Sequence, residues 1–385
     1  MRAHSECNWL SMLVEKRVGD VAYEVNPARP CALALDDNLY ELLGESDEVS
    51  IDNLMDALIE RAGKPRPLSL MWHMTRRCNF ACPFCFIRDN SFDGDPTFDS
   101  VLPLLERIIS LGLVRATLSG GECLLVKDFP SIYRYLKESG VLVTIFTNGS
   151  LIDEGVLNLF SELPPFSVEI TFYDDDFESR PYRAALSLRN LGIDVLGKFT
   201  VSREKAALLH SVERWCALHD IPFLFDPVLF NGENGIDAES QAVNGEALVD
   251  LNVRRFGVGY GDENVVCTPL RSLQCKAADR AVFLSPELEL SICPDMKRRW
   301  ATAGKGFDEA YRLMRLWIEE LKDVPIEGCS GCIDRPLCNM CTARSELIES
   351  PHGTRICVPE GHCREVATLG EKMRRRIREQ KGDMR

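Results

Sequence analysis

Short apolar runs and amphipathic stretches alternate along the middle of the chain. Six apolar runs are expected to be strands, at 68–73, 115–118, 141–146, 167–172, 195–200 and 223–225. Most are separated by amphipathic stretches such as 100–111, where Leu102, Leu105, Ile108 and Ile109 share one helical face. Because the runs do not alternate with polar residues, both faces of the expected sheet should be covered.

Six consecutive strand and helix units predict an α/β fold with a parallel sheet. The pattern leaves open whether this sheet is flat or partly closed into a barrel. In either arrangement, functional groups gather at the carboxyl ends of the strands. We assign this predicted core to residues 66–235, because the alternation stops after Phe230 and a turn-rich boundary follows.

The first 65 residues predict a separate small α+β module. The expected elements are strands at 21–25 and 32–35 and helices at 38–44 and 51–62. In the second helix Ser50 is the expected N-cap, and Leu54, Leu58 and Ile59 form the apolar face.

Length and charge narrow the class of protein. A chain of 385 residues is long enough for one large domain with smaller modules. Its net charge of -14 argues against a general nucleic-acid binder, which needs a basic face. No apolar run is long enough to span a membrane and no signal peptide precedes the first module, so we expect a cytoplasmic protein. The basic stretch 366–385 is expected to be a solvated helix or tail.

The 16 cysteines are the unusual feature of the composition. A reducing compartment does not sustain a disulfide framework of that size, so metal binding is the natural interpretation. Cys7, Cys31 and Cys216 are isolated and are expected to be small buried hydrophobes. From Cys267 onward the cysteines recur among Gly, Pro and short polar stretches, and we expect this part to be organised by metal instead of by an apolar core.

Cys78, Cys82 and Cys85 form a CxxxCxxC spacing on the loop after the first expected core strand. Three thiolates on a short loop can bind three irons of a four-iron four-sulfur cluster and leave the fourth iron free for chemistry. A structural zinc site is the alternative, although it normally has four protein ligands and CxxC pairs. Three unrelated core cysteines are a further alternative.

This spacing resembles the radical S-adenosylmethionine (SAM) superfamily, including the aromatic residue just before the third cysteine. Two more motifs are similar to that family's and follow the next two strands: Gly-Gly-Glu at 120–122 and Thr-Asn-Gly at 147–149. The stretches 168–173 and 197–201 resemble the fourth and fifth strands of its peptide-modifying branch. The cofactor-binding residues implied are Phe84, Gly120, Gly121, Glu122, Thr147, Asn148, Gly149, Thr171 and Lys198.

The resemblance implies a partial (β/α)6 TIM-like barrel and a defined chemistry. The open iron would chelate SAM, and an electron from the cluster would cleave SAM to a 5'-deoxyadenosyl radical. Glu122 would bind the amino group of SAM. Two positions depart from the family pattern: Cys123 replaces the usual proline after the glutamate, and Asp174 replaces the glycine that usually follows Tyr173.

A second cysteine array resembles the SPASM domain, which we assign to residues 236–365 and which binds two auxiliary iron-sulfur clusters. The resemblance implies one cluster held by Cys267, Cys275, Cys293 and Cys341. The other would take Cys329, Cys332 and Cys338, with a fourth ligand from either Cys357 or Cys363. Two departures, the CxxC spacing at the end of the array and Leu288 in place of a glycine, leave the ligand order open, and zinc remains an alternative.

SPASM-bearing relatives mostly mature ribosomally made peptides or protein side chains. The expected activity is therefore hydrogen abstraction from a peptide residue, followed by an oxidative crosslink or related change, with a flavodoxin or ferredoxin as electron donor. Residues 1–65 resemble a winged-helix-like leader-peptide recognition element, or else cap the barrel. Asp226 and Asp295 are candidates for proton transfer. The alternatives are sulfatase maturation, oxidation of a small molecule, and a zinc or iron-sulfur scaffold without turnover.

Overall fold

The computed structural model describes residues 14–18, 21–25, 32–34, 51–227, 229, 234–243, 247–248, 250–251, 277–304, 306–322, 324, 326, 332–334, 343, 346–350, 353–357 and 360–383. The expected helix at 38–44 and its neighbour Ser50 lie outside this set. So do seven cysteines, namely Cys7, Cys31, Cys267, Cys275, Cys329, Cys338 and Cys341.

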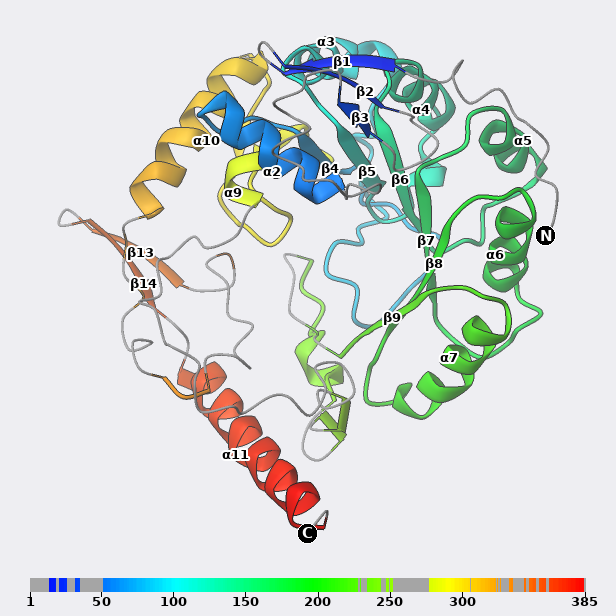
Figure 1. The fold of residues 1–385 in the computed structure, drawn as a ribbon, viewed down its shortest axis with the longest axis vertical. Coiled ribbons are helices and arrows are strands. Elements are labelled where there is room, and N and C mark those ends of the chain that lie inside the picture. Colours follow the sequence, from blue (N-terminus) through cyan, green and yellow to red (C-terminus); the bar gives the residue numbers. More distant parts are fainter. Residues whose placement is uncertain are drawn as a thin grey trace.

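A nine-stranded sheet with the order β12-β11-β10-β4-β5-β6-β7-β8-β9 forms the centre of the molecule (Figure 1). Six parallel strands follow each other in sequence: β4 (Ser69–His73), β5 (Arg115–Ser119), β6 (Leu142–Thr147), β7 (Ser167–Phe172), β8 (Val195–Thr200) and β9 (Phe223–Asp226). Their bounds agree with the expected strands to within one residue. The α/β class and the mostly parallel sheet are therefore confirmed.

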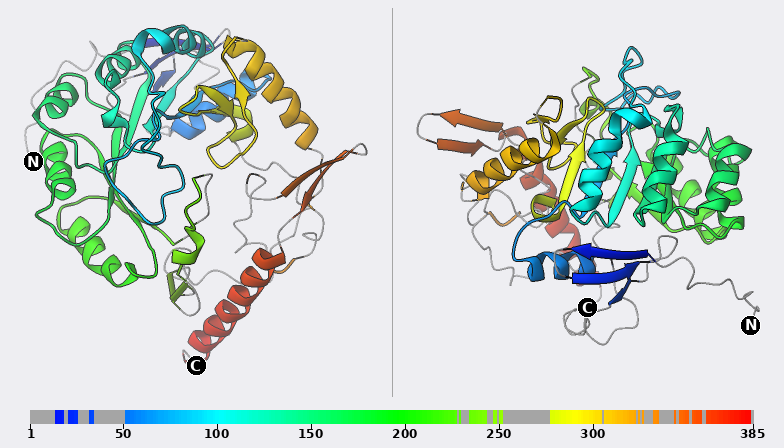
Figure 2. Two further views of the ribbon diagram at one scale, coloured as in Figure 1. Left: turned by 180° about the vertical axis from the view of Figure 1, so that it is seen from behind. Right: turned by 90° about the horizontal axis from the view of Figure 1, so that it is seen from above.

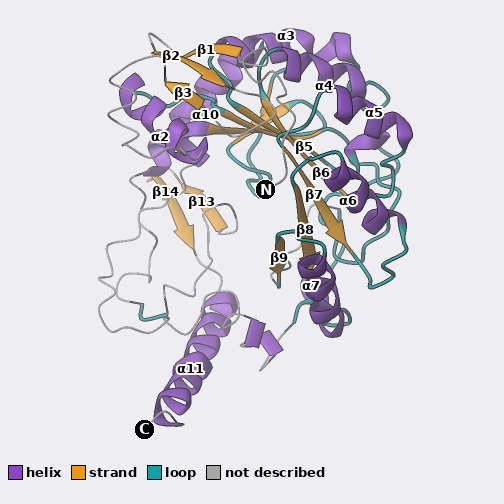
Figure 3. Cartoon of the chain, turned by 45° about the vertical axis from the view of Figure 1, so that its right-hand side comes forward, coloured by secondary structure: helices purple, strands orange, loops and turns teal. Residues whose placement is uncertain are grey.

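The helices after these strands cover one face of the sheet, as Figure 3 shows. They are α3 (Phe98–Ser110), α4 (Phe129–Glu138), α5 (Glu154–Glu162), α6 (Arg180–Asn190) and α7 (Leu209–Leu218). Helix α3 begins two residues before the expected start because Thr97 and Ser100 form a capping box. Its buried face includes Val101 beside Leu105 and Ile108.

The two faces of the parallel strands differ in polarity. Facing the helices, side chains such as Leu118, Ile145 and Ile170 are fully buried. The opposite, inner face carries Thr171 and Lys198, which are only partly buried. This inner face, at the carboxyl ends of the strands, is therefore where polar chemistry can be placed.

Three further strands extend the sheet beyond β4. β10 (Ala281–Leu284) pairs parallel to β4, and β11 (Glu289–Ser291) and β12 (Trp300–Ala301) follow antiparallel. Helix α10 (Gly306–Lys322) packs on them through Met314, Trp317 and Ile318, which belong to the same apolar core as the central strands. The expectation that metal, and not a core, organises this part is therefore wrong for residues 277–322.

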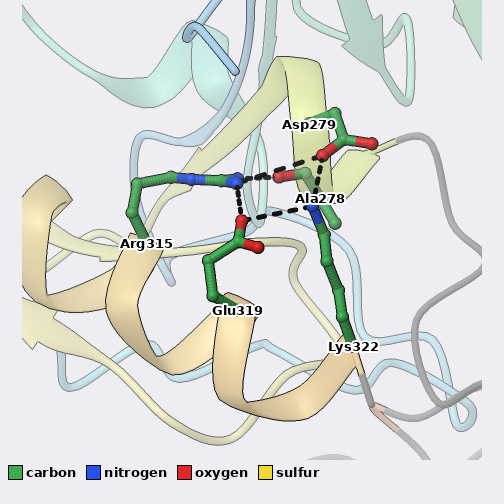
Figure 4. Close-up of polar contacts among 5 residues, drawn as sticks. All are labelled: Ala278, Asp279, Arg315, Glu319 and Lys322. Carbon is green, nitrogen blue, oxygen red and sulfur yellow. Dashed lines mark hydrogen bonds and ion pairs between the residues drawn. The ribbon is translucent and has the colours of Figure 1, made fainter. Parts of the chain in front are cut away.

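Polar contacts fasten α10 to the short helix α9 (Ala277–Arg280), which leads into β10 (Figure 4). Arg315 donates to the Ala278 carbonyl oxygen and lies 2.8 Å from Glu319. Lys322 bridges Glu319 at 3.2 Å and Asp279 at 3.1 Å. These half-exposed pairs orient the helix, while its buried apolar face supplies most of the stability.

Helix α2 (Ile51–Ala62), which has the expected bounds, closes the amino-terminal ends of the strands. Its buried Leu54 and Leu58 pack with Leu68, Val114 and Leu142, residues that stand at the starts of β4, β5 and β6. This end lies opposite the carboxyl ends at which the cysteine loop begins. Helix α2 therefore acts as a floor under the sheet.

A three-stranded antiparallel sheet precedes α2 and lies on the same side of the molecule (Figure 2, right). It contains β1 (Val14–Val18), β2 (Val21–Val25) and β3 (Ala32–Ala34), in the order β1-β2-β3. β1 is absent from our expectations because only its two end residues are apolar. The dipeptide Gly-Asp at 19–20, a sequence that is common in two-residue hairpin turns, is the signal that would have predicted it.

Near the C-terminus lie a hairpin of β13 (Glu346–Ser350) and β14 (Gly353–Cys357) and the helix α11 (Glu360–Asp383). Helix α11 contains the basic stretch and extends away from the central sheet (Figure 1). Arg374 pairs with the buried Asp334, which fastens this helix to the segment that follows Cys332. Within the described chain, no helix is both long and apolar enough to cross a bilayer.

Lys137 on α4 is 4% exposed, and burial lowers its pKa to about 7. In the unfolded chain the same group titrates near 10.5, so the folded state binds fewer protons between these values. The free energy of unfolding should therefore rise with pH between about 7 and about 10. Relative to wild type, Lys137→Met should flatten this rise in denaturant titrations. Identical pH profiles for both proteins would contradict the prediction.

Candidate functional site

The three cysteines of the CxxxCxxC spacing lie on the loop that follows β4, at its carboxyl end. All three are partly buried. The Cys78 amide donates to Asn90 Oδ1 at 2.9 Å, and the Cys85 amide donates to the Cys82 carbonyl oxygen at 3.2 Å. These backbone bonds hold the three cysteines together on one short loop.

Two of the three sulfurs receive a hydrogen bond from the loop itself. Backbone amides of Phe80 and Arg88 donate to the sulfurs of Cys78 and Cys85, both at 3.3 Å. Burial raises the pKa of the Cys82 thiol to about 11, and the neighbouring Tyr173 opposes this effect. The Cys82 thiolate therefore needs a nearby positive charge.

This donor set fits an iron-sulfur cluster, because cluster thiolates characteristically accept such hydrogen bonds and are stabilised by iron. Among the residues that the structure describes, no three His, Cys, Asp or Glu side chains gather closely enough to bind a single metal ion. A cubane cluster makes a different demand, because each of its thiolates binds a separate iron.

The Gly-Gly-Glu turn after β5 runs directly against the start of the cysteine loop. The Gly121 amide donates to the Thr75 carbonyl oxygen at 2.8 Å, and the Glu122 amide donates to the Arg77 carbonyl oxygen at 2.9 Å. A Cβ on Gly120, whose φ is +136°, would lie 2.6 Å from the Thr75 oxygen. A Cβ on Gly121 would overlap the carbonyl group of Arg77. Both glycines are therefore required by chain packing.

The Glu122 carboxylate is 1% exposed and joins this turn to the one after β6. It accepts from the Thr147 hydroxyl at 2.9 and 3.0 Å, from the Asn148 amide at 2.8 Å and from the Leu124 amide at 3.2 Å. Burial raises its pKa, and these donors oppose that effect. The carboxylate thus has a set of partners from the chain itself. Its expected contact with the SAM amino group remains a prediction.

The Thr-Asn-Gly turn after β6 reaches back to the cysteine loop. Asn148 donates to Asn79 Oδ1 at 2.9 Å and lies 3.9 Å from the Cys78 sulfur. Asn79 in turn donates to the Ser150 hydroxyl at 2.8 Å. Gly149 adopts a φ of +74°, and a Cβ there would lie 3.2 Å from Pro181 Cα, so this position also favours glycine.

The expected polar residues of the inner face, Thr171 and Lys198, are opposite each other on β7 and β8. Lys198 lies 3.3 Å from the buried carboxylate of Glu169 and 5.9 Å from the centre of the Phe146 ring. Glu169 is nearly buried, whereas Lys198 is about one-third exposed. The Lys198 ammonium therefore places a positive charge on the more exposed side of this face. Glu169 is a site residue that our sequence reasoning missed.

Phe84 lies in an aromatic group with Phe80 and Tyr173. The ring of Tyr173 is 5.3 Å from that of Phe80, edge-on, and 6.4 Å from that of Phe84, nearly parallel. Tyr173 directly follows β7 and was quoted only as part of a strand resemblance. Its contacts with these two rings depend on tertiary structure, so no local signal could have assigned it.

The opposite side of the cysteine loop contacts the added strands. Arg76 pairs with Glu287 at 2.5 Å, and His73 packs edge-on against Phe283 at 4.8 Å. Burial, together with Arg299 and Arg76, lowers the pKa of His73 to about 3, so this imidazole is neutral. Cys293 lies in the segment that follows β11. These contacts therefore link the strands that lead into Cys293 to β4 and the cysteine loop.

The remaining predicted residues are the cysteines of the second array and the two candidate aspartates. Cys293 and Cys332 are half-buried and Cys363 is exposed, while the side chain of Cys357 lies outside the described set. Asp226 ends β9 and Asp295 follows Cys293, and both are partly buried.

Cys123, the departure from the family pattern, belongs to the apolar core. It is buried, its sulfur lies 3.5 Å from the Phe146 carbonyl oxygen, and burial raises the pKa of its thiol well above the usual value. Cys216 is likewise buried in the core, as expected.

Comparison with known proteins identifies the central part of the chain. Residues 72–193 match the Radical SAM superfamily. The Fe-coproporphyrin III synthase of Methanosarcina barkeri is 28% identical over 170 residues, which cover 41% of this chain and 40% of that protein. The PqqA peptide cyclase of Granulibacter bethesdensis is 23% identical over 155 residues, covering 36% and 41%. The matched regions thus span less than half of these relatives.

The fold is similar to that of a solved structure over most of the chain. Streptococcus suis SuiB bound to S-adenosylmethionine superimposes with a TM-score of 0.58, covering 86% of this chain and 93% of that one. The sequence identity is 13%, so the likeness concerns the fold alone.

Gly121→Ala should disrupt the contact between the Gly-Gly-Glu turn and the cysteine loop, because the added methyl group overlaps backbone atoms that cannot move aside. We expect loss of most iron at Cys78, Cys82 and Cys85, measured by iron and sulfide content after anaerobic purification. Gly155→Ala, at an exposed helical position of α5, is the matched control and should retain its iron. Normal iron in both proteins would contradict this account.

Glu122→Gln tests the role of the buried carboxylate. An amide NH₂ would face one of the donors that now bind an oxygen, leaving buried groups unpaired at a cost of about 1–3 kcal/mol. We expect a lower denaturant midpoint, whereas Thr147→Ser, which keeps the hydroxyl, should change it much less. An unchanged midpoint for Glu122→Gln, together with weakened SAM binding, would instead favour direct contact with the cofactor.

Proposed function

Because the chain contains a radical SAM domain, we propose that it is an enzyme that abstracts hydrogen from a residue of a peptide substrate and forms an oxidative crosslink or related modification. One observation carries the proposal. Three half-buried cysteines, two of whose sulfurs accept backbone hydrogen bonds, lie on a loop that contacts the Gly-Gly-Glu and Thr-Asn-Gly turns at the carboxyl ends of adjacent strands.

Cys78, Cys82 and Cys85 would hold a four-iron four-sulfur cluster, which with bound SAM supplies a 5'-deoxyadenosyl radical. The chain would hold SAM through Phe84, the backbone of the two turns, Thr171 and Lys198. The ammonium of Lys198 suits a carboxylate or a ribose hydroxyl, and its pairing with Glu169 fixes its position. The inner face of the sheet would then receive the residue to be modified.

A peptide substrate is supported by the sequence relative named PqqA peptide cyclase. The small sheet β1-β2-β3 has two edge strands, either of which can accept an extended peptide by strand addition. We therefore assign residues 1–65 to leader-peptide recognition. Asp226, the last residue of β9, and Asp295, in the loop after β11, are proposed as proton acceptors for the substrate.

Two auxiliary four-iron four-sulfur clusters are proposed for residues 236–365. One would be held by Cys267, Cys275, Cys293 and Cys341, and the other by Cys329, Cys332, Cys338 and either Cys357 or Cys363. The contacts from Arg76 and His73 to the β10–β11 segment support placing the first of these near the cysteine loop, because that segment leads into Cys293. An auxiliary cluster would accept the electron that the substrate loses, and a flavodoxin or ferredoxin would supply the electron that cleaves SAM.

Cys82→Ala tests the proposal directly. Relative to wild type, this variant should lose about four irons per chain and all release of 5'-deoxyadenosine from SAM, while the auxiliary clusters remain. The matched control is Cys216→Ala, since Cys216 is buried in the core and distant in sequence from the loop. It should keep both its iron and its SAM cleavage.

The measurements are iron and sulfide content and chromatography of the SAM products under a strong chemical reductant. Wild-type protein that contains only zinc and does not cleave SAM would overturn the proposal. Peptide modification is then followed by mass spectrometry, in which a crosslink removes two hydrogens.

A further inference from the structure

Asn234, in the segment that follows β9, reaches the cysteine loop from far along the chain. Its side-chain NH₂ group donates to the Cys85 carbonyl oxygen at 2.8 Å and to the Arg88 carbonyl oxygen at 3.4 Å. These two carbonyl groups stand at the two ends of the turn that follows the third cysteine. Asn234 and Cys85 are 149 residues apart in sequence, so no local pattern could have indicated this contact.

The direction of the Asn234 side chain is set by the backbone next to it. The Ile236 amide donates to Asn234 Oδ1 at 3.3 Å, so the oxygen end is occupied and the NH₂ end faces the two carbonyl oxygens. Exchanging the two ends would place an oxygen against two other oxygens and would take the acceptor away from the Ile236 amide. The hydrogen bonds therefore fix both ends of this side chain.

The segment that carries Asn234 is anchored at its other end to the loop after β8. The Arg203 amide donates to the Gln241 carbonyl oxygen at 2.8 Å. Directly beside this bond, Ser202 and Ala242 form an antiparallel bridge. Asn234 is thus presented to the cysteine loop by a segment that is itself held by the central sheet.

The turn that Asn234 holds supplies the hydrogen bond to the third cysteine. Within it, the Arg88 amide donates to the Cys85 sulfur at 3.3 Å. Asn234 binds the carbonyl oxygens of these same two residues, so the amide cannot turn away from the sulfur without breaking those bonds. A donor to a cluster sulfur offsets negative charge. The reduced cluster carries one more negative charge than the oxidised cluster, so it gains more from this donor.

We propose that Asn234 is a positioning residue that keeps the Arg88 amide on the Cys85 sulfur and thereby raises the reduction potential of the cluster held by the cysteine loop. A higher potential makes the cluster easier to reduce by a one-electron donor. The proposal rests on the proposed function, because it requires a cluster at Cys78, Cys82 and Cys85.

Asn234→Asp is the decisive variant. It keeps the shape of the side chain and the acceptor for Ile236, and it replaces the NH₂ group by an oxygen that repels the two carbonyl oxygens. In hydrogen–deuterium exchange of the full chain, the amides of residues 85–90 should exchange about tenfold faster than in wild type. The cluster potential should shift to a more negative value, measured by redox titration of the electron paramagnetic resonance signal that changes when SAM is added.

Asn158→Asp, at an exposed position of α5, adds the same charge elsewhere and is the matched control. It should change neither the exchange at residues 85–90 nor the potential. Unchanged exchange in Asn234→Asp, or faster exchange with an unshifted potential, overturns this inference while leaving the proposed function intact.

Asn234→Ala removes the donor without adding a charge, and it takes the place of Asn234→Asp in the titration if the latter loses its iron. If both variants lose their iron, exchange is compared with iron-free wild type, and equal exchange at residues 85–90 overturns the inference. A wild-type protein without the SAM-sensitive signal would instead overturn the proposed function.

Discussion

The candidate site depends on the hydrogen bonds that the buried carboxylate of Glu122 accepts. It gathers the hydroxyl of Thr147 and two backbone amides, and so fixes the turn after β6 against the turn after β5. The second of these turns is in backbone contact with the cysteine loop through Gly120 and Gly121. One charged group that is removed from solvent therefore sets the relative positions of three loops. Such a group must keep all its donors, since an unpaired buried charge is costly.

The floor formed by α2 and the site at the opposite end of the strands have contrasting chemistry. At the floor, Leu54 and Leu58 pack on the starts of the strands with apolar contacts, and rigidity follows from packing. At the site, polar groups are held by one another and by the strand ends. This division lets the sheet remain rigid while the inner face stays accessible, which suits a fold that must bind a cofactor and a larger substrate at one end.

The sequence was sufficient where local pattern decides structure. β7, β8 and α2 have the expected bounds, because each is bounded by clear turns and has a consistent apolar pattern. β10, β11 and β12 were missed because they are short and because β10, on which the other two build, is stabilised by pairing with β4, which is far away in the chain. In the site, the cysteines were found from their spacing, and the Gly-Gly-Glu and Thr-Asn-Gly turns from their resemblance to motifs of the radical SAM superfamily. The partners of Glu122, the charge pair of Glu169 and the ring contacts of Tyr173 required the tertiary fold.

The pairing of β10 with β4 has a consequence for how the chain can be divided. β4 carries the cysteine loop at its end, and its outer edge is covered by a strand from the second half of the sequence. Cutting the chain after the sixth parallel strand would leave this edge with a row of unpaired amides and carbonyls, open to other chains. The core residues Leu70 and Trp72 would also lose their β10 partners, Val282 and Leu284. The boundary that the sequence pattern suggests after residue 235 is therefore not a point at which the folded chain can be divided.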